Sequence, residues 1–308
     1  MAVLSVDLAY RRWSDLGIVV LDRQHSPNSA SIDCEIVPVT TAGLDPSLAA
    51  DPVDANILAG RLNHLCAVRN INLIVLDGPQ AWKSRHNGLE HARISERQLN
   101  TAAKTGLPGM VKPITYRLFA EFCLDVYDAL CRRGWRRLDT RDHPATSAVQ
   151  NQERILVESY PHAAWKSLGL EPLPSKRRAK VSDLAKAYGA LNALIPIRTN
   201  RPPNHDQLQA IVGGLPGLAI EERNSTAARI VGNPPRREEG HWREGFIVLP
   251  LPPPRPIEIR WLHLGLLILV LAGGYLFVTE GAGVLRPLNG SKFTEGFSPG
   301  AGLSGLRG

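Results

Sequence analysis

Four acidic residues occur at comparable positions, each in or at the end of a strand-like segment or at the start of a helix-like one. They are Asp7 in LSVDLAY, Asp77 in LIVLDGP, Glu158 in ILVES and Asp206 in NHDQLQAIVGG. Parallel strands present their C-terminal ends on one edge of a sheet, where open α/β proteins commonly carry their sites. We therefore expect the four carboxylates to converge at that edge. Taken singly, each acid has a plainer interpretation as a turn or capping residue, and Asp206 could simply cap its helix.

Converging carboxylates repel one another and raise one another's pKa, and a divalent cation removes that penalty. Oxygen ligands favour Mg²⁺ or Mn²⁺, and the absence of a CxxC pair among the four cysteines argues against zinc. Two such ions about 3.5–4 Å apart can activate a water and stabilise the leaving oxygen in phosphodiester cleavage. We expect Asp7 to bridge the ions and the other three acids to complete their coordination.

A basic segment and two histidines are candidates for supporting roles. The segment PSKRRAK supplies four cations that could contact phosphates, or that could form an ordinary solvated face: Lys176, Arg177, Arg178 and Lys180. The net charge of +7 and the pI of 9.4 are compatible with a nucleic-acid partner. His162 and His205 lie close in sequence to the acids, and each is either a proton shuttle or a structural imidazole bonded to backbone.

Apolar patterning predicts an α/β protein with a mixed sheet of RNase H-like type. An antiparallel meander is expected first, then a helix and a parallel strand, at residues 2–8, 16–22, 34–39, 54–68 and 72–77. Later elements are a helix over 115–133, a strand ending at Glu158, helices beginning at residues 161, 182 and 205, and a strand over 245–250. The helix over 115–133 should bury a stripe formed by Leu118, Phe119, Phe122, Val126 and Leu130, and the helix beginning at residue 205 should be short, ending at Val212.

The composition changes after residue 250. We expect a domain over residues 1–250, a Pro-rich linker over 251–260, a hydrophobic segment over 261–279 and a Gly-rich tail over 280–308. Residues 261–279 carry no formal charge and are near the length that a bilayer requires. Arg255 and Arg260 precede this segment, which favours a cytoplasmic domain anchored to the inner face of a membrane. A buried hairpin and an extension without settled structure are the alternatives.

Several short motifs occur in a fixed order over residues 3–250: LSVDLA, LIVLDGPQAW, ISERQL, VESYPHAAWKSLG, HDQLQAIVGGL and EGFIVLP. This ordered set resembles the domain-of-unknown-function 429 family, whose members are described as predicted nucleases of RNase H-like fold. The resemblance implies that Asp7, Asp77, Glu158 and Asp206 occupy the metal-site positions. The last helix of such proteins tends to read Asp-x-x-Asp-Ala, as in the related junction resolvases, and Gln209 stands at the second acid. Either Asp206 suffices, or metal affinity is weakened and catalysis has been lost.

Two functions follow from these observations. One is a metal-dependent nuclease acting on structured or single-stranded nucleic acid, and the other is a non-catalytic RNase H-like binding or scaffold protein. An ATP-using kinase of the same strand order is disfavoured, because DLAYRRWSD, which follows the first strand, lacks the Gly-rich turn that brings backbone N–H groups to a nucleotide.

Overall fold

The computed structural model describes residues 2–23, 31–38, 51–141 and 153–253. The chain divides into two units, residues 1–254 and 255–308. The predicted hydrophobic segment over 261–279, its membrane anchoring and the Gly-rich tail lie outside the described residues. Within the described part, no helix is both long and apolar enough to cross a bilayer.

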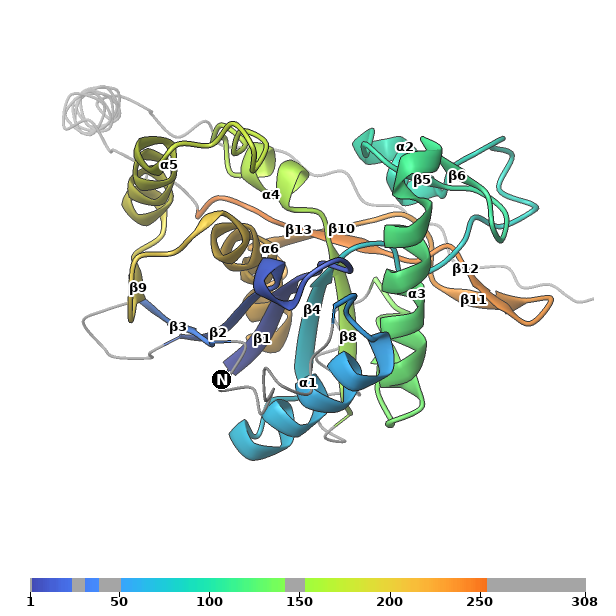
Figure 1. The fold of residues 1–308 in the computed structure, drawn as a ribbon, viewed down its shortest axis with the longest axis horizontal. Helices are drawn as coiled ribbons and strands as arrows, with labels where there is room; N and C mark the ends of the chain where they lie inside the picture. Colours follow the sequence, from blue (N-terminus) through green and yellow to red (C-terminus); the bar gives the residue numbers. More distant parts are fainter. Residues whose placement is uncertain (1, 24–30, 39–50, 142–152, 254–308) are drawn as a thin grey trace, which may run out of the picture. The chain divides into compact units, whose positions relative to one another are not determined.

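A nine-stranded mixed sheet forms the centre of the described domain (Figure 1). Its order is β10-β13-β8-β4-β1-β2-β3-β9, with β7 also paired to β8. The strands are β1 (Ala2–Asp7), β2 (Gly17–Arg23), β3 (Ile32–Ile36), β4 (Leu73–Asp77), β7 (Arg136–Arg137), β8 (Ile155–Ser159), β9 (Ile197–Thr199), β10 (Ala228–Val231) and β13 (Ile247–Pro250). Strands β1 to β3 form an antiparallel meander, and β4 and β8 continue from β1 in parallel. This arrangement is RNase H-like and confirms the predicted mixed α/β fold.

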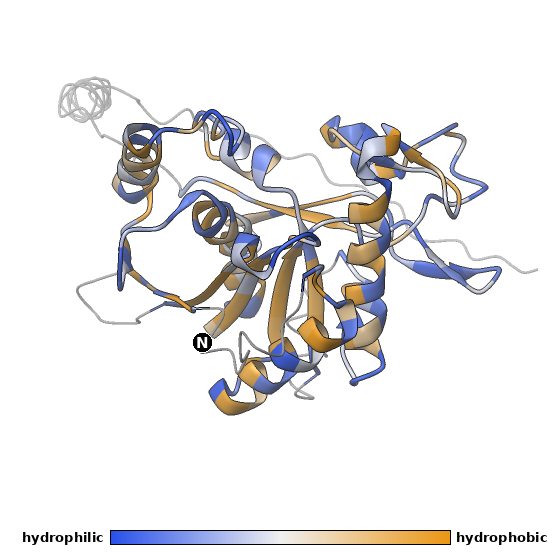
Figure 2. Ribbon diagram, viewed as in Figure 1, coloured by the Kyte–Doolittle hydropathy of each residue, from blue (hydrophilic) through white to orange (hydrophobic). Residues whose placement is uncertain are grey.

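Side-chain alternation along the strands divides the core into two layers, one on each face of the sheet. Val3, Val75 and Val157 pack with α4 (Pro161–Ser167), α5 (Val181–Leu194) and α6 (His205–Glu221). The intervening Leu4, Leu76 and Leu156 pack with α1 (Ala55–Arg69) and α3 (Arg117–Cys131). Figure 2 shows that the central strands are mainly hydrophobic, whereas the helices around them carry both hydrophobic and hydrophilic residues.

Several short elements were not predicted, because two- to six-residue segments leave little periodicity to detect. They comprise β7, β9 and β10 of the central sheet, α2 (Ile94–Leu99), β5 (Lys104–Thr105), β6 (Val111–Lys112), the hairpin of β11 (Arg236–Glu238) and β12 (His241–Arg243), and the 3₁₀ turns Trp13–Asp15 and Ile114–Tyr116. The predicted core stripe of α3 is wrong at Leu118, which is exposed. Its side chain is 63% exposed, since it lies in the first turn of the helix, beyond the edge of the packed layer.

Helix α6 is longer than predicted and runs past Val212 to Glu221. The predicted end at Val212 is wrong, and the glycines that follow it within α6 let the helix approach the sheet closely. A Cβ at Gly214 would lie 2.6 Å from the Cβ of Ser5, and one at Gly217 would lie 2.5 Å from Cγ2 of Val75. The Ser5 hydroxyl donates to the carbonyl of Ala210 at 2.7 Å, which fixes the helix on β1.

We expect Gly214→Ala to destabilise the protein by about 1–3 kcal/mol, because the added methyl overlaps Ser5 and the 2.7 Å neighbour Leu21. Gly189→Ala is the matched control, since Gly189 lies in α5 and a Cβ there meets nothing within 4 Å. The control should be neutral or stabilised by about 0.5–1 kcal/mol through helix propensity. Urea unfolding measures both changes, and equal stability of the two variants would contradict the close packing of α6.

Candidate acidic site

Asp7 and Asp77 form the centre of the site, at the C-terminal ends of two neighbouring parallel strands. The register of β1 and β4 pairs Asp7 directly with Asp77, so both carboxyls leave the same face of the sheet. A side-chain hydrogen bond joins them. Burial raises the pKa of Asp7 well above its ordinary value, and repulsion from Asp77 and Asp206 raises it further. Burial, with a smaller repulsion from Glu158, raises the pKa of Asp77 to about 7.

Asp206 reaches the same edge from the first turn of α6. Asn204 caps this helix, since its side-chain oxygen accepts from the Gln207 backbone N–H at 2.9 Å, so capping does not occupy Asp206. A Cβ at Gly17 would lie 2.2 Å from the carbonyl oxygen of Asp206, and Gly17 pairs with Asp7 in the β1–β2 register. Close contact between β2 and α6 therefore brings Asp206, whose side chain is 8% exposed, beside Asp7.

Lys176 supplies positive charge to this group of acids. Its ammonium forms an ion pair with Asp15 at 2.7 Å and a second with Asp206. The same ammonium lowers the pKa of Asp7, opposing the effect of burial. Of the four cations predicted to contact phosphate, Lys176 is thus the one placed beside the acids. Arg177, Arg178 and Lys180 are exposed in the same segment, and their phosphate contacts stay a prediction.

The two histidines occupy different environments. His205 Nδ1 lies 3.3 Å from an oxygen of Asp206, and its Nε2 lies 3.0 Å from the carbonyl oxygen of Pro174. This ring therefore holds the segment before α5 against the start of α6. His162 is exposed, and its ring packs against Tyr160 with the ring centroids 5.9 Å apart. Partial burial and the charge of Lys166 lower the pKa of His162.

Glu158 lies close to Asp77 but has other partners. The register pairs Glu158 with Leu76, so its side chain leaves β8 on the opposite face from that of Asp77. Its carboxylate accepts two hydrogen bonds from Arg93, at 2.6 and 2.7 Å, and one from the Gln80 backbone N–H at 3.0 Å. The Arg93 and Glu158 side chains are 1% and 3% exposed. Binding of a metal by Glu158 would therefore require this buried ion pair to open.

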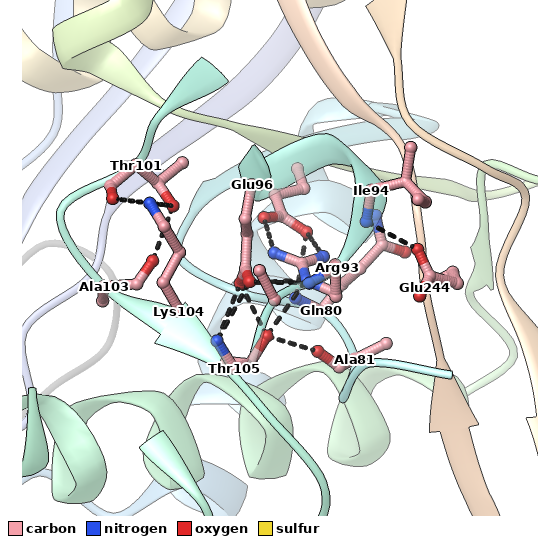
Figure 3. A network of polar contacts seen from close by, with 12 residues as sticks. Gln80, Ala81, Arg93, Ile94, Glu96, Thr101, Ala103, Lys104, Thr105 and Glu244 are labelled. Carbon is pink, nitrogen blue, oxygen red and sulfur yellow. Dashed lines mark hydrogen bonds and ion pairs between the residues drawn. The ribbon is translucent and has the colours of Figure 1, made fainter. Parts of the chain in front are cut away.

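Arg93 connects Glu158 to the lobe formed by α2, β5 and β6, and Figure 3 shows its position beside Glu96 and Thr105 in that lobe. Its Nε donates at 3.1 Å to Glu96 and to the Thr105 hydroxyl, and Glu96 also accepts from the Thr105 backbone N–H. The buried guanidinium of Arg93 donates hydrogen bonds to both glutamates, and its loss would leave their carboxylates buried without a cationic partner. Arg93 was not predicted from the sequence, because a single arginine at the start of a short helix resembles a solvent-exposed residue.

Gln209 does not face the acids. Its side-chain oxygen accepts a hydrogen bond at 2.9 Å from the indole N–H of Trp165, which is fully buried in the core. The Asp-x-x-Asp pattern expected from the family resemblance is therefore replaced by a packing contact between α6 and α4. Asp206 is the carboxylate that this part of α6 contributes.

The donor set fits a hard divalent ion in its chemistry. Asp7, Asp77 and Asp206 offer carboxylate oxygens, and a bound cation would favour the ionised forms of Asp7 and Asp77, whose pKa values are raised mainly by burial. In the arrangement described, Lys176 and a hydrogen bond between carboxyls take the place of such an ion. Within the described ranges, no group of three or more His, Cys, Asp or Glu side chains is positioned to hold a metal.

Comparisons with known proteins found similar solved structures, two of which are described below, and no sequence relative. No family model matches the chain, and no curated protein matches it. The structure of Thermus thermophilus RuvC is similar at a TM-score of 0.31 and 11% identity, covering 72% of this chain and 96% of that one. T. thermophilus RuvC in complex with a Holliday junction substrate gives a TM-score of 0.31 and 10% identity, covering 75% and 99%. A likeness this distant adds nothing to the site, and the fold assignment rests on the strand order itself.

The raised pKa values predict that the metal-free protein loses stability as the pH rises. A carboxyl whose pKa is higher in the folded state than in the unfolded state stabilises the fold when it is protonated. This contribution is complete at a pH below the unfolded-state pKa, and it is lost as the pH rises through the folded-state pKa. For Asp77 this window runs from 3.8 to about 7. We expect a loss on the order of 2–4 kcal/mol across it.

Asp7→Asn should make this loss smaller and should stabilise the metal-free protein at neutral pH, because the amide still donates to Asp77 without adding charge. Asp139→Asn is the control, since Asp139 lies in an exposed ion pair with Arg136. Urea unfolding in EDTA over this pH range measures the effect. A wild-type stability that rises with pH, or an Asp7→Asn variant with the wild-type dependence, would contradict the assignment.

Proposed function

We propose that this chain is a divalent-metal-dependent nuclease that hydrolyses phosphodiester bonds. The observation that carries the proposal is the direct pairing of Asp7 with Asp77 at the sheet edge, where α6 also delivers Asp206. Membership of the domain-of-unknown-function 429 family is part of the same proposal and rests on the ordered motifs. The role of Glu158 as a metal ligand stays a prediction, and the proposal relies on the three aspartates.

The charges at the site favour one metal ion rather than two. Gln209 is bonded to Trp165, and Glu158 is neutralised by Arg93, so three aspartates are left to hold a cation. A bound Mg²⁺ or Mn²⁺ would polarise a phosphate oxygen and lower the pKa of a bound water. Lys176 would supply the second positive charge, because its ammonium already lies beside Asp206 and its side chain is 49% exposed.

The nucleic-acid strand would cross this edge toward the segment that contains Lys176. The exposed side chains of Arg177, Arg178 and Lys180 extend the positive charge beyond the aspartates. Contacts to phosphates position a nucleic acid without reading its sequence. The proposal therefore includes nucleic acid as the substrate and assigns no base preference to these three residues.

The second candidate function is a non-catalytic RNase H-like binding or scaffold protein. One observation favours it, namely that Lys176 and Arg93 already compensate acids at this edge without a metal. In that case the ion pair of Lys176 would be a permanent structural contact. Metal binding separates the two candidates.

Calorimetric titration of the full chain with Mn²⁺ is the test. We expect one ion to bind the wild type, and binding to weaken at least about tenfold in Asp7→Asn, which loses a charged ligand, corresponding to about 1.4 kcal/mol. Lys176→Met should bind Mn²⁺ more tightly, because the competing ammonium is gone, and should cleave nucleic acid more slowly. Arg177→Met, from the same exposed segment, is the matched control and should keep the wild-type affinity.

Cleavage of single-stranded, hybrid and branched substrates with Mg²⁺ or Mn²⁺ completes this experiment. Absence of metal binding, or binding unchanged in Asp7→Asn, would contradict the nuclease and favour the scaffold. Metal binding without cleavage of any of these substrates would also favour a binding role.

A further inference from the structure

A pocket of about 180 Å³ lies next to Asp77, and neither Asp206 nor Lys176 is among the residues that line it. Its walls come from the ends of β4 and β8, the start of α3 and the lobe of α2, β5 and β6. Three aromatic side chains line it, namely Tyr116, Phe119 and Tyr160. The chain segment 101–103 forms a further part of the wall. The pocket thus combines aromatic surface with the carboxyl of Asp77, the partner of Asp7.

The charges of the lining residues exclude a phosphate from the pocket itself. Asp77, Glu96 and Glu158 line it together with a single arginine, Arg93. The guanidinium of Arg93 is already bonded to both glutamates and to Thr105. An anion would therefore meet net negative charge, and a neutral group is the better occupant.

The aromatic lining suits a planar ring, and Tyr160 provides a polar contact for its edge. The Tyr160 hydroxyl accepts a hydrogen bond from the Ala102 backbone N–H at 3.3 Å, and among the described residues its own proton has no acceptor. Burial raises the pKa of Tyr160, so the hydroxyl keeps this proton at neutral pH. Tyr116 is 40% exposed, which leaves its ring accessible to a ligand. Aromatic side chains of this kind stack with nucleobases regardless of sequence.

We propose that this pocket binds one unpaired nucleobase of the nucleic-acid strand, with the adjoining phosphate placed at Asp7 and Asp77. The inference rests on the proposed nuclease function and narrows its substrate. Because the pocket is recessed between the sheet edge and the lobe, a base within a stacked duplex must leave the stack to enter it. The substrate class is therefore a single strand, or a duplex with an extruded base, whose backbone runs from the pocket across the acids toward Lys176.

Fluorescence anisotropy of the full chain with two labelled oligonucleotides tests the proposal. One is a single-stranded oligothymidylate, and the other has the same backbone with its central bases removed. Ca²⁺ replaces Mg²⁺ in the buffer, so that binding is measured separately from cleavage. We expect the strand with bases to bind roughly tenfold more tightly than the abasic strand, since stacking of one base has an effect of this size.

Ala103→Trp should fill the pocket, and Tyr116→Ala should remove part of the stacking surface. Both should bring the affinity for the base-containing strand down to that for the abasic strand. Leu118→Ala is the matched control, because Leu118 is exposed in the first turn of α3, two residues after Tyr116, and lies outside the pocket lining. Its discrimination between the strands should equal that of the wild type.

Equal binding of the two strands by the wild type, or no binding of either, would overturn the base pocket, whatever the variants do. Discrimination that survives Ala103→Trp would place the base elsewhere and overturn it as well. These results are separable from the proposed function, because Mn²⁺ binding and cleavage are measured independently. A chain that prefers the base-containing strand but does not cleave would retain the pocket and lose the nuclease.

Discussion

The pairing of Asp7 with Asp77 is the constraint on which the rest of the site depends. Two parallel strands in register bring two carboxyls together in a desolvated place, where both cannot carry full charge without a counterion. In the structure, a hydrogen bond between the two carboxyls and the nearby ammonium of Lys176 reduce the repulsion between them. In the proposed function, a bound divalent cation reduces this repulsion instead.

Two other features of the fold determine which side chains lie at the edge of the sheet where Asp7 and Asp77 meet. The glycines of α6 let the helix lie directly on β1 and β4, and the cap by Asn204 leaves Asp206 available beside Asp7. On the opposite face, Arg93 neutralises Glu158 and attaches the α2 lobe to β8. This lobe forms one wall of the pocket beside Asp77, so the ion pair that withdraws Glu158 from the acids also shapes the proposed base site.

The fold was largely predictable from the sequence. Residues 72–77 are almost wholly apolar, which is typical of a central strand, and the helical spacing of apolar residues in α1 and α3 predicts these helices. Proximity of the acids was predictable for Asp7, Asp77 and Asp206, since strand ends and the start of α6 share an edge. The partners of Glu158, Lys176 and Gln209 were not, because each depends on a residue distant in the sequence. Glu158 also shows that one step of strand register decides which face a side chain occupies.

The length of α6 was mispredicted for a related reason, since glycines that break an isolated helix can favour one that packs closely against a sheet.

The most direct test of the metal site is a crystal structure of the full chain grown with Mn²⁺, with anomalous diffraction used to locate the ion. We predict a single anomalous peak within coordination distance of both Asp7 and Asp77, about 2.0–2.3 Å from their oxygens. Carboxyls that stay hydrogen-bonded to each other at saturating Mn²⁺, with no peak between them, would contradict the proposed site.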